Sequence, residues 1–156
     1  MVMLASWDIS LYPRINVYLM LFKMTVVNNK KVARAFMKWS ALDEPRVLQC
    51  LSYGTLPTVN VYESLYESTD HNGKFKPSIP NDIFIARDIA QKYNRAKTTD
   101  DIFKAQKILE RVILHELCHW GRHLIGASDE YYENGLDSGG KFAQEAYSDP
   151  LQPHRG

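Results

Sequence analysis

The stretch VILHELCHW, residues 112–120, combines a helical pattern with side chains that bind metals. Its apolar residues recur at the spacing of one helix face, late in a helical pattern that begins near residue 101. Inside it, His115, Glu116 and His119 form the pattern H-E-x-x-H. Residues four apart on a helix lie one turn apart on the same face, so these two imidazoles can bind one metal ion.

The residue types of this pattern suit zinc chemistry. Zinc lowers the pKa of a bound water to about 7 and polarises a substrate carbonyl. Glu116, beside the first histidine, can reach that water and act as the general base. The alternative is a pair of histidines satisfied by hydrogen bonds at the edge of a core. The long helical pattern around the motif favours the metal centre.

The two cysteines, Cys50 and Cys118, are too few for a disulfide scaffold. Cys118 lies between the two histidines in the sequence and could be read as a zinc ligand. On a helix, however, each residue is turned by about 100° from its neighbour, so Cys118 lies off the face that the histidines share. We therefore expect Cys118 to be a packed thiol.

A catalytic zinc ion usually has three protein ligands and a water. His123 continues the series of His115 and His119, but it lies about 12 Å along the helix axis from His115, too far to share one ion. The third ligand is therefore expected to be an acidic residue downstream. The candidates are Asp129, Glu130, Glu133, Asp137, Glu145 and Asp149.

Two of these acids, Glu145 and Asp149, lie four residues apart in QEAYSDP, on one face of a predicted last helix that Pro150 ends. One carboxylate of such a pair can bind the metal while the other accepts the N–H of a ligand histidine, which fixes the tautomer of that histidine. We predict Glu145 as the third ligand and Asp149 as the acceptor.

The rest of the pattern predicts an α+β domain. The apolar run 15–22 is a buried strand or helix, and residues 28–42 have the pattern of an amphipathic helix. Residues 58–64 alternate as a half-buried strand does, and residues 82–86 form a second short strand that leads into a helix. A polar segment separates these two strands, which predicts a hairpin with a long loop. Gly121 or Gly126 is available to end the motif helix.

Length and composition set broad limits on function. The chain has 156 residues, which suits a single domain over residues 1–156. Its net charge is +1, with Lys and Arg spread along the chain, so nucleic-acid binding has no support. The run 15–22 is too short to span a bilayer, and no basic leader with a small-residue cleavage site precedes it. We therefore expect neither a membrane span nor a signal peptide.

The motif at 115–119, followed by Glu145 and Asp149, resembles the gluzincin metallopeptidases. A closer resemblance is to the small metallopeptidase toxin domains of bacterial polymorphic toxins and type VI secretion spike proteins. It covers residues 56–150 and rests on HELCHWG combined with F-x-x-E-A-Y. Such domains often read F-E-x-E-A-Y-G, whereas this chain has Ala143 and Ser148, which leaves one ligand candidate within that segment.

The resemblance implies a zincin-like fold, in which the motif helix lies beneath a small sheet and Zn²⁺ is the cofactor. In such folds an edge strand pairs with an extended peptide substrate by strand addition, and residues 83–86 are the best match for that strand. A tyrosine or histidine often stabilises the oxyanion. The candidates for that role are Tyr131, Tyr132, Tyr147, His123 and His154.

The leading functional hypothesis is a zinc metallopeptidase whose Glu116 activates water, acting on a protein or peptide as an antibacterial effector. It would be delivered by a secretion apparatus to the periplasm or cytosol of a target cell, with a spike protein and an immunity protein as partners. One alternative is a zinc-dependent peptidoglycan amide hydrolase. The other is a non-catalytic adaptor domain of a secretion spike. Structural zinc sites use four Cys and His ligands, so the need for an acidic ligand favours catalysis.

Overall fold

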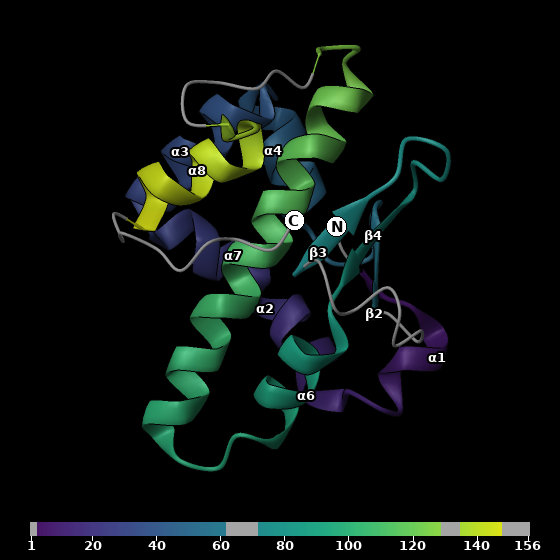
Figure 1. The fold of residues 1–156 in the computed structure, drawn as a ribbon, viewed down its shortest axis with the longest axis vertical. Coiled ribbons are helices and arrows are strands. Elements are labelled where there is room, and N and C mark those ends of the chain that lie inside the picture. The colour runs from purple at the N-terminus through teal and green to yellow at the C-terminus, as the bar shows by residue number, and fades with distance from the viewer. Residues whose placement is uncertain (1–2, 62–71, 129–134, 148–156) are drawn as a thin grey trace.

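The computed structural model describes residues 3–61, 72–128 and 135–147 (Figure 1). The strands are β1 (Met3–Leu4), β2 (Thr58–Val61), β3 (Gly73–Phe75) and β4 (Asp82–Ile85). The helices are α1 (Ser6–Ile9), α2 (Pro13–Asn28), α3 (Lys30–Ser40), α4 (Glu44–Leu51), α6 (Arg87–Arg95), α7 (Thr99–Leu124) and α8 (Ser138–Tyr147). This part of the chain is α+β, as the sequence predicts, and the apolar run 15–22 is helical.

The four strands form one sheet in the order β1-β2-β4-β3. β2 is parallel to both of its neighbours, and Val59 pairs with Leu4 on one side and Ile83 on the other. β3 is antiparallel to β4, with Phe75 opposite Ile83. The predicted hairpin between residues 58–64 and 82–86 is therefore wrong. Parallel neighbours need a crossover connection, and here β3 lies within it.

The position of β4 corrects a second expectation. Residues 83–86 were matched to an edge strand, but β4 lies between β2 and β3. Within the described residues, the strand at this edge of the sheet is β3, which is hydrogen-bonded on one side only. Any strand addition at this edge would therefore use β3.

β2 is buried on both faces, not half-buried as its alternation predicts. Asn60 is only 4% exposed, although it occupies the polar position of the pattern. Its amide Nδ2 donates to the carbonyl of Thr58 at 3.2 Å and to Oδ1 of Asp82 at 2.9 Å. These bonds satisfy the polar group inside the sheet, so a central strand can carry it.

α7 is the central element of the molecule. Figure 1 shows it running along the length of the fold, with α3 and α8 on one side and the strands on the other. Its buried side chains include Leu109, Val112, Ile113 and Leu117, which hold the helix against both layers. Because α7 is anchored on both sides, the side chains of its motif have fixed surroundings.

The ends of α7 follow ordinary capping rules. Thr98 accepts the N–H of Asp101 at 3.1 Å, and acidic residues occupy the first turn. Gly126, with φ +71°, follows the last turn, so it is the glycine that ends the helix. Gly121 lies inside the helix, where a Cβ would come within 3.0 Å of the Leu42 side chain. Its function is therefore close packing of α7 on the segment after α3.

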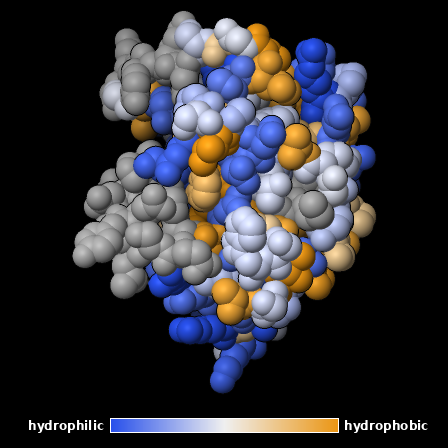
Figure 2. Space-filling view, turned by 90° about the vertical axis from the view of Figure 1, so that its right-hand side faces the viewer, coloured by the Kyte–Doolittle hydropathy of each residue, from blue (hydrophilic) through white to orange (hydrophobic). Residues whose placement is uncertain are grey.

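Hydrophobic and hydrophilic side chains alternate over one face of the part of the molecule that the structure describes. Figure 2 shows the side of the molecule that carries the strands and α1, where hydrophobic residues form scattered patches among hydrophilic ones. Among the described helices, none is both long enough and apolar enough to cross a bilayer.

Candidate metal centre

His115 and His119 meet on one face of α7, as their spacing predicts. The Nε2 atoms of the two rings are 3.2 Å apart. His115 is 1% exposed, and the side chain of His119 is 13% exposed. One ring is therefore enclosed by the fold while the other borders solvent.

Asp137 brings a carboxylate to the same point from the segment that leads into α8. Its Oδ2 lies 3.2 Å from Nε2 of His119, and its Oδ1 lies 3.7 Å from Nε2 of His115. The ligand atoms of these three residues all lie within 4.8 Å of one another. The described residues thus contain a group of two imidazoles and one carboxylate that could hold a metal ion.

The spacing of these atoms fits a tetrahedral ion. Ligand bonds of about 2.0–2.1 Å in tetrahedral geometry place neighbouring ligand atoms roughly 3.3 Å apart. The two shortest separations in the group are each 3.2 Å. Two histidines and one carboxylate also leave a fourth position for water, as catalytic sites do and closed structural sites do not.

Asp137 is fixed by the helix that it begins. Its Oδ1 accepts the N–H of Gly140 at 2.7 Å, and its carbonyl accepts the N–H of Lys141 at 2.9 Å. Burial alone would raise the pKa of Asp137, but the hydrogen bond to His119 and the positive potential of both histidines hold it well below its usual value. The carboxylate is therefore an anion that is oriented by α8 and directed at the histidines.

Gly139 allows the start of α8 to lie directly on His115. A Cβ at residue 139 would come within 2.5 Å of Cδ2 of the buried imidazole, closer than any side chain can approach. The absence of a side chain is therefore required at this position. It lets the first turn of α8 pack against the ring of His115 while the carboxylate of Asp137 reaches toward His119.

Glu116 lies beside this group and against the sheet. Its Oε1 is 3.9 Å from Nε2 of His115, and the residue is 3% exposed. A Cβ at Gly73 would come within 2.9 Å of Cγ of Glu116 and 2.8 Å of a Val112 methyl. The backbone of β3 thus lies directly on the glutamate, at the edge of the sheet.

The structure does not bring Glu145 to this group. Glu145 lies on the outer side of α8, with its side chain 43% exposed, and its Oε1 is 3.4 Å from Nζ of Lys38. Its other oxygen accepts the indole N–H of Trp39. Among the described acids, the geometry favours Asp137 over Glu145 as the third ligand. Asp149 lies outside the described residues, so its predicted bond to a ligand histidine stays a prediction.

The sequence contains one feature that points to Asp137, although the spacing between acidic residues does not reveal it. Asp137 precedes a helix whose first turn contains Gly139 and Gly140. An aspartate before a helix is a common N-cap, and two glycines in a first turn weaken a helix unless close packing requires them. That combination indicates a helix start pressed against another element, here α7.

Of the candidates for oxyanion stabilisation, the structure describes Tyr147 and His123, and their surroundings differ. Tyr147 is engaged in the interior, because its hydroxyl donates to Oε1 of the buried Glu110 at 2.8 Å. Burial and the charge of Glu110 raise the pKa of Tyr147 above its ordinary value. His123 is exposed at the end of α7, with its ring 5.5 Å from that of Phe75. Tyr131, Tyr132 and His154 lie outside the described residues.

Both cysteines are packed thiols, and for Cys118 this agrees with the sequence analysis. Cys118 is fully buried, and Cys50 is 1% exposed. Burial raises the pKa of Cys50 to about 12, so this thiol stays protonated at neutral pH. We therefore assign packing as the function of both residues.

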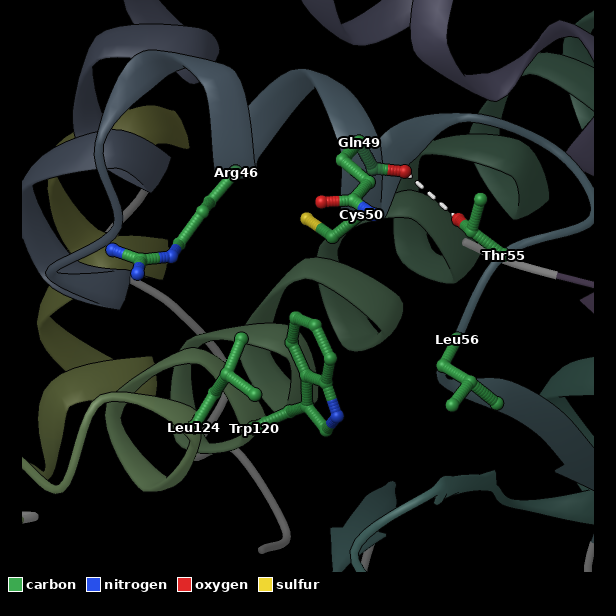
Figure 3. Close-up of a pocket in the computed structure, with 7 residues that line it drawn as sticks. All are labelled: Arg46, Gln49, Cys50, Thr55, Leu56, Trp120 and Leu124. Carbon is green, nitrogen blue, oxygen red and sulfur yellow. Dashed lines mark hydrogen bonds between the residues drawn. The ribbon is translucent and has the colours of Figure 1, made fainter.

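A pocket of about 330 Å³ opens on a different face of α7 (Figure 3). Its lining residues are Arg46, Gln49, Cys50, Thr55, Leu56, Trp120 and Leu124. Trp120 follows His119 in the sequence and is turned from it by about 100° around the helix. The pocket therefore lies between α4 and α7, away from the face that carries the two histidines.

Comparison with known families places the chain in a family of metallopeptidase toxins. The model of a family described as metallopeptidase toxin 3 matches residues 8–148. This span begins in α1, before the segment 56–150 in which the sequence shows a resemblance, and it extends just past the end of α8. Comparisons with curated proteins and with solved structures gave no match.

Proposed function

The chain belongs to the metallopeptidase toxin 3 family, and from that premise we propose that it is a zinc-dependent peptidase acting on a protein substrate. The observation that carries this proposal is the group formed by His115, His119 and Asp137 beside the buried Glu116. Each of these residues has the chemistry that the reaction requires at its position. We assign residues 1–156 to one metallopeptidase domain.

The three ligand residues would hold zinc through two Nε2 atoms and one carboxylate oxygen. When bound, zinc would polarise the substrate carbonyl and lower the pKa of a water to about 7. Because Oδ1 of Asp137 already accepts the N–H of Gly140, we assign Oδ2 to the metal. Asp137 then supplies a negative charge and a fixed direction, both set by the first turn of α8.

Glu116 is proposed as the general base. It takes a proton from the attacking water at its carboxylate and returns a proton to the amine that leaves. Its position supports this role, since its Oε1 lies 3.9 Å from Nε2 of His115 and its side chain is enclosed by Val112 and the backbone of β3. A carboxylate in such surroundings is shielded from solvent and held close to the ligands.

β3 is proposed as the strand that binds the substrate. It is the edge strand beside Glu116, and its backbone reaches the glutamate because residue 73 has no side chain. An extended peptide that pairs with β3 would gain main-chain hydrogen bonds, which give affinity without demanding a particular sequence. The carbonyl to be attacked would then pass close to Glu116 and the metal group.

The family supports a toxin role, and we propose that the protein is a secreted antibacterial effector. A secretion-spike protein as carrier and an immunity protein as inhibitor are the partners that this role predicts. Peptidoglycan amide hydrolysis and a non-catalytic adaptor function are the competing hypotheses. The metal group would serve the first of these equally well, whereas an adaptor has no use for a buried glutamate beside three ligand residues.

The test compares wild-type protein with Glu116→Gln. We expect near-stoichiometric zinc in both proteins, with proteolysis of a denatured protein substrate and toxicity in bacteria for the wild type alone. Gln keeps the shape of Glu, so its contact with β3 is preserved. Wild-type protein that binds no zinc, or a Glu116→Gln variant with full activity, would overturn the proposal. Cleavage of purified cell wall but of no protein would favour the amide hydrolase.

A further inference from the structure

His123 extends the row of histidines on α7 beyond the metal group. It is four residues after His119, about one helical turn and 6 Å further along the axis. The last turn of α7 carries it, and its side chain is exposed. From His115, however, His123 lies two turns and about 12 Å along the axis, too far for one ion to bind both, although it borders the same face.

Phe75 meets His123 from the edge strand. The centroids of the two rings are 5.5 Å apart, and their planes are tilted by 56°. Phe75 is half-buried and packs against the core, whereas His123 is open to solvent. The two rings make one aromatic wall that joins the edge of the sheet to the end of α7.

The geometry of β3 places this wall relative to Glu116. Gly73 lies on Glu116, and Phe75, two residues further along β3, lies on His123. Residues two apart on a strand point to the same face and are separated by about 6.6 Å. A peptide paired with β3 therefore directs two side chains toward α7, one near Glu116 and the next near the wall.

From this register, and on the basis of the proposed function, we propose that Phe75 and His123 form a substrate subsite that selects an aromatic or large aliphatic side chain. In a substrate strand paired with β3, one residue lies opposite Gly73. The selected side chain belongs to the substrate residue two positions away, which lies opposite Phe75. A flat aromatic wall offers contact area on which aromatic and large aliphatic side chains pack well. Phe75 and His123 are thus specificity residues, separate from the proposed catalytic group.

The test measures cleavage of a peptide library by the wild type and by His123→Ala, Phe75→Ala and Leu124→Ala. Leu124 is the matched control, because it is exposed beside His123 but lines the pocket on the other face of α7. Wild-type protein and Leu124→Ala should prefer substrates with an aromatic or large aliphatic residue at the position that lies opposite Phe75. His123→Ala and Phe75→Ala should lower kcat/KM for such peptides about tenfold or more. His123→Ala, which changes an exposed side chain outside β3, should cleave peptides with alanine there as the wild type does.

Binding gives a second measurement that needs no turnover. The same peptides are titrated onto Glu116→Gln, with and without His123→Ala, and fluorescence anisotropy reports the Kd. We expect weaker binding with His123→Ala for the aromatic peptides only. Identical profiles in all variants, or equal losses for every peptide, would overturn the subsite. Selective binding by Glu116→Gln, together with a wild type that cleaves none of the peptides, would leave the subsite standing and refute the peptidase proposal.

Discussion

Oδ2 of Asp137 lies 3.2 Å from Nε2 of His119, although the two residues belong to segments that approach from different directions. His119 is part of α7, and Asp137 begins α8 by accepting the N–H of Gly140 through Oδ1. One carboxylate therefore joins the start of a helix to the candidate metal centre. The position of α8 and the geometry of the site depend on the same side chain.

The first prediction concerns the third ligand. Asp137→Asn should weaken zinc binding by more than about 100-fold, the upper end of what is lost when a partner outside the ligand set is removed. The amide oxygen of Asn can still cap α8, so the metal-free variant should unfold at nearly the wild-type temperature. Competition with a calibrated chelator measures the zinc affinity.

Glu145→Gln is the control for that experiment. Glu145 bonds to Lys38 and Trp39 at the surface, so its replacement should leave zinc affinity unchanged. A large loss with Glu145→Gln, together with normal binding by Asp137→Asn, would assign the third ligand to Glu145 instead.

The second prediction concerns removal of the metal. Zinc that binds only the folded protein stabilises it by about 2.7 kcal/mol when its free concentration is a hundred times Kd. Chelation should therefore lower the Tm of the wild type by several degrees, and added zinc should restore it. Asp137→Asn should show a much smaller shift in calorimetry. Equal shifts in both proteins would place the stabilising zinc elsewhere.

The third prediction compares two adjacent glycines. Gly139→Ala would place a Cβ 2.5 Å from the buried ring of His115, so it should cost about 1–3 kcal/mol in unfolding free energy and weaken zinc binding. At Gly140 a Cβ would lie 3.1 Å and 3.4 Å from two Leu136 side-chain carbons and 3.3 Å from Oδ1 of Asp137, so Gly140→Ala needs only a small shift of its neighbours and should cost clearly less. Urea unfolding and zinc titration of both variants make the comparison. Equal effects at the two positions would contradict the close packing of α8 on His115.

The fourth prediction concerns the buried bond between Tyr147 and Glu110. Tyr147→Phe removes a donor at 2.8 Å and leaves Glu110 with the longer bond from Tyr18 at 3.4 Å. Because the acceptor is a buried carboxylate, we expect a loss of about 1.5–3 kcal/mol at neutral pH, measured by urea unfolding. A loss below a few tenths of a kcal/mol would show that this bond contributes little to holding α8 on α7.

The stability difference between the wild type and Tyr147→Phe should also depend on pH. Burial and the charge of Glu110 raise the pKa of Tyr147 above its ordinary value of 10.0. Below pH 10 the tyrosine is neutral in both states, so its contribution to stability is complete. Above pH 10 the unfolded chain loses the proton first, which favours unfolding. The stability difference between wild type and Tyr147→Phe should therefore shrink as the pH rises toward about 11. A difference that stays constant would contradict the raised pKa.

The sequence predicts much of the helical part of the fold. α7 has a continuous apolar period, a capping threonine and a terminal glycine, so its existence and its motif follow from local rules. The sheet does not follow from local rules. β1 has two residues and β3 has three, and β3 lies in a stretch that reads as a polar loop. Strands this short have no pattern to fix their order, which here depends on tertiary packing.

In the candidate site, too, some features follow from local sequence rules and others depend on tertiary packing. His115, Glu116 and His119 are brought together by helix geometry alone, so their spacing predicts their juxtaposition. Which acidic side chain lies beside the two histidines depends on how α8 is rotated against α7. Phe142, Ala143 and Ala146 turn into the core, which leaves Glu145 facing outward toward α3. A four-residue spacing shows that two side chains share a face, but it cannot show which neighbour that face meets.

The contact between the backbone at Gly73 and the side chain of Glu116 also bears on how such proteins diverge. The separation between β3 and α7 is set there by main chain against one glutamate, with no variable side chain between them. The neighbouring Lys74 and His123 are less restricted, because Lys74 is only half-buried and His123 is exposed. We therefore expect relatives to differ in the side chains that surround the candidate metal centre while the spacing between β3 and α7 stays the same.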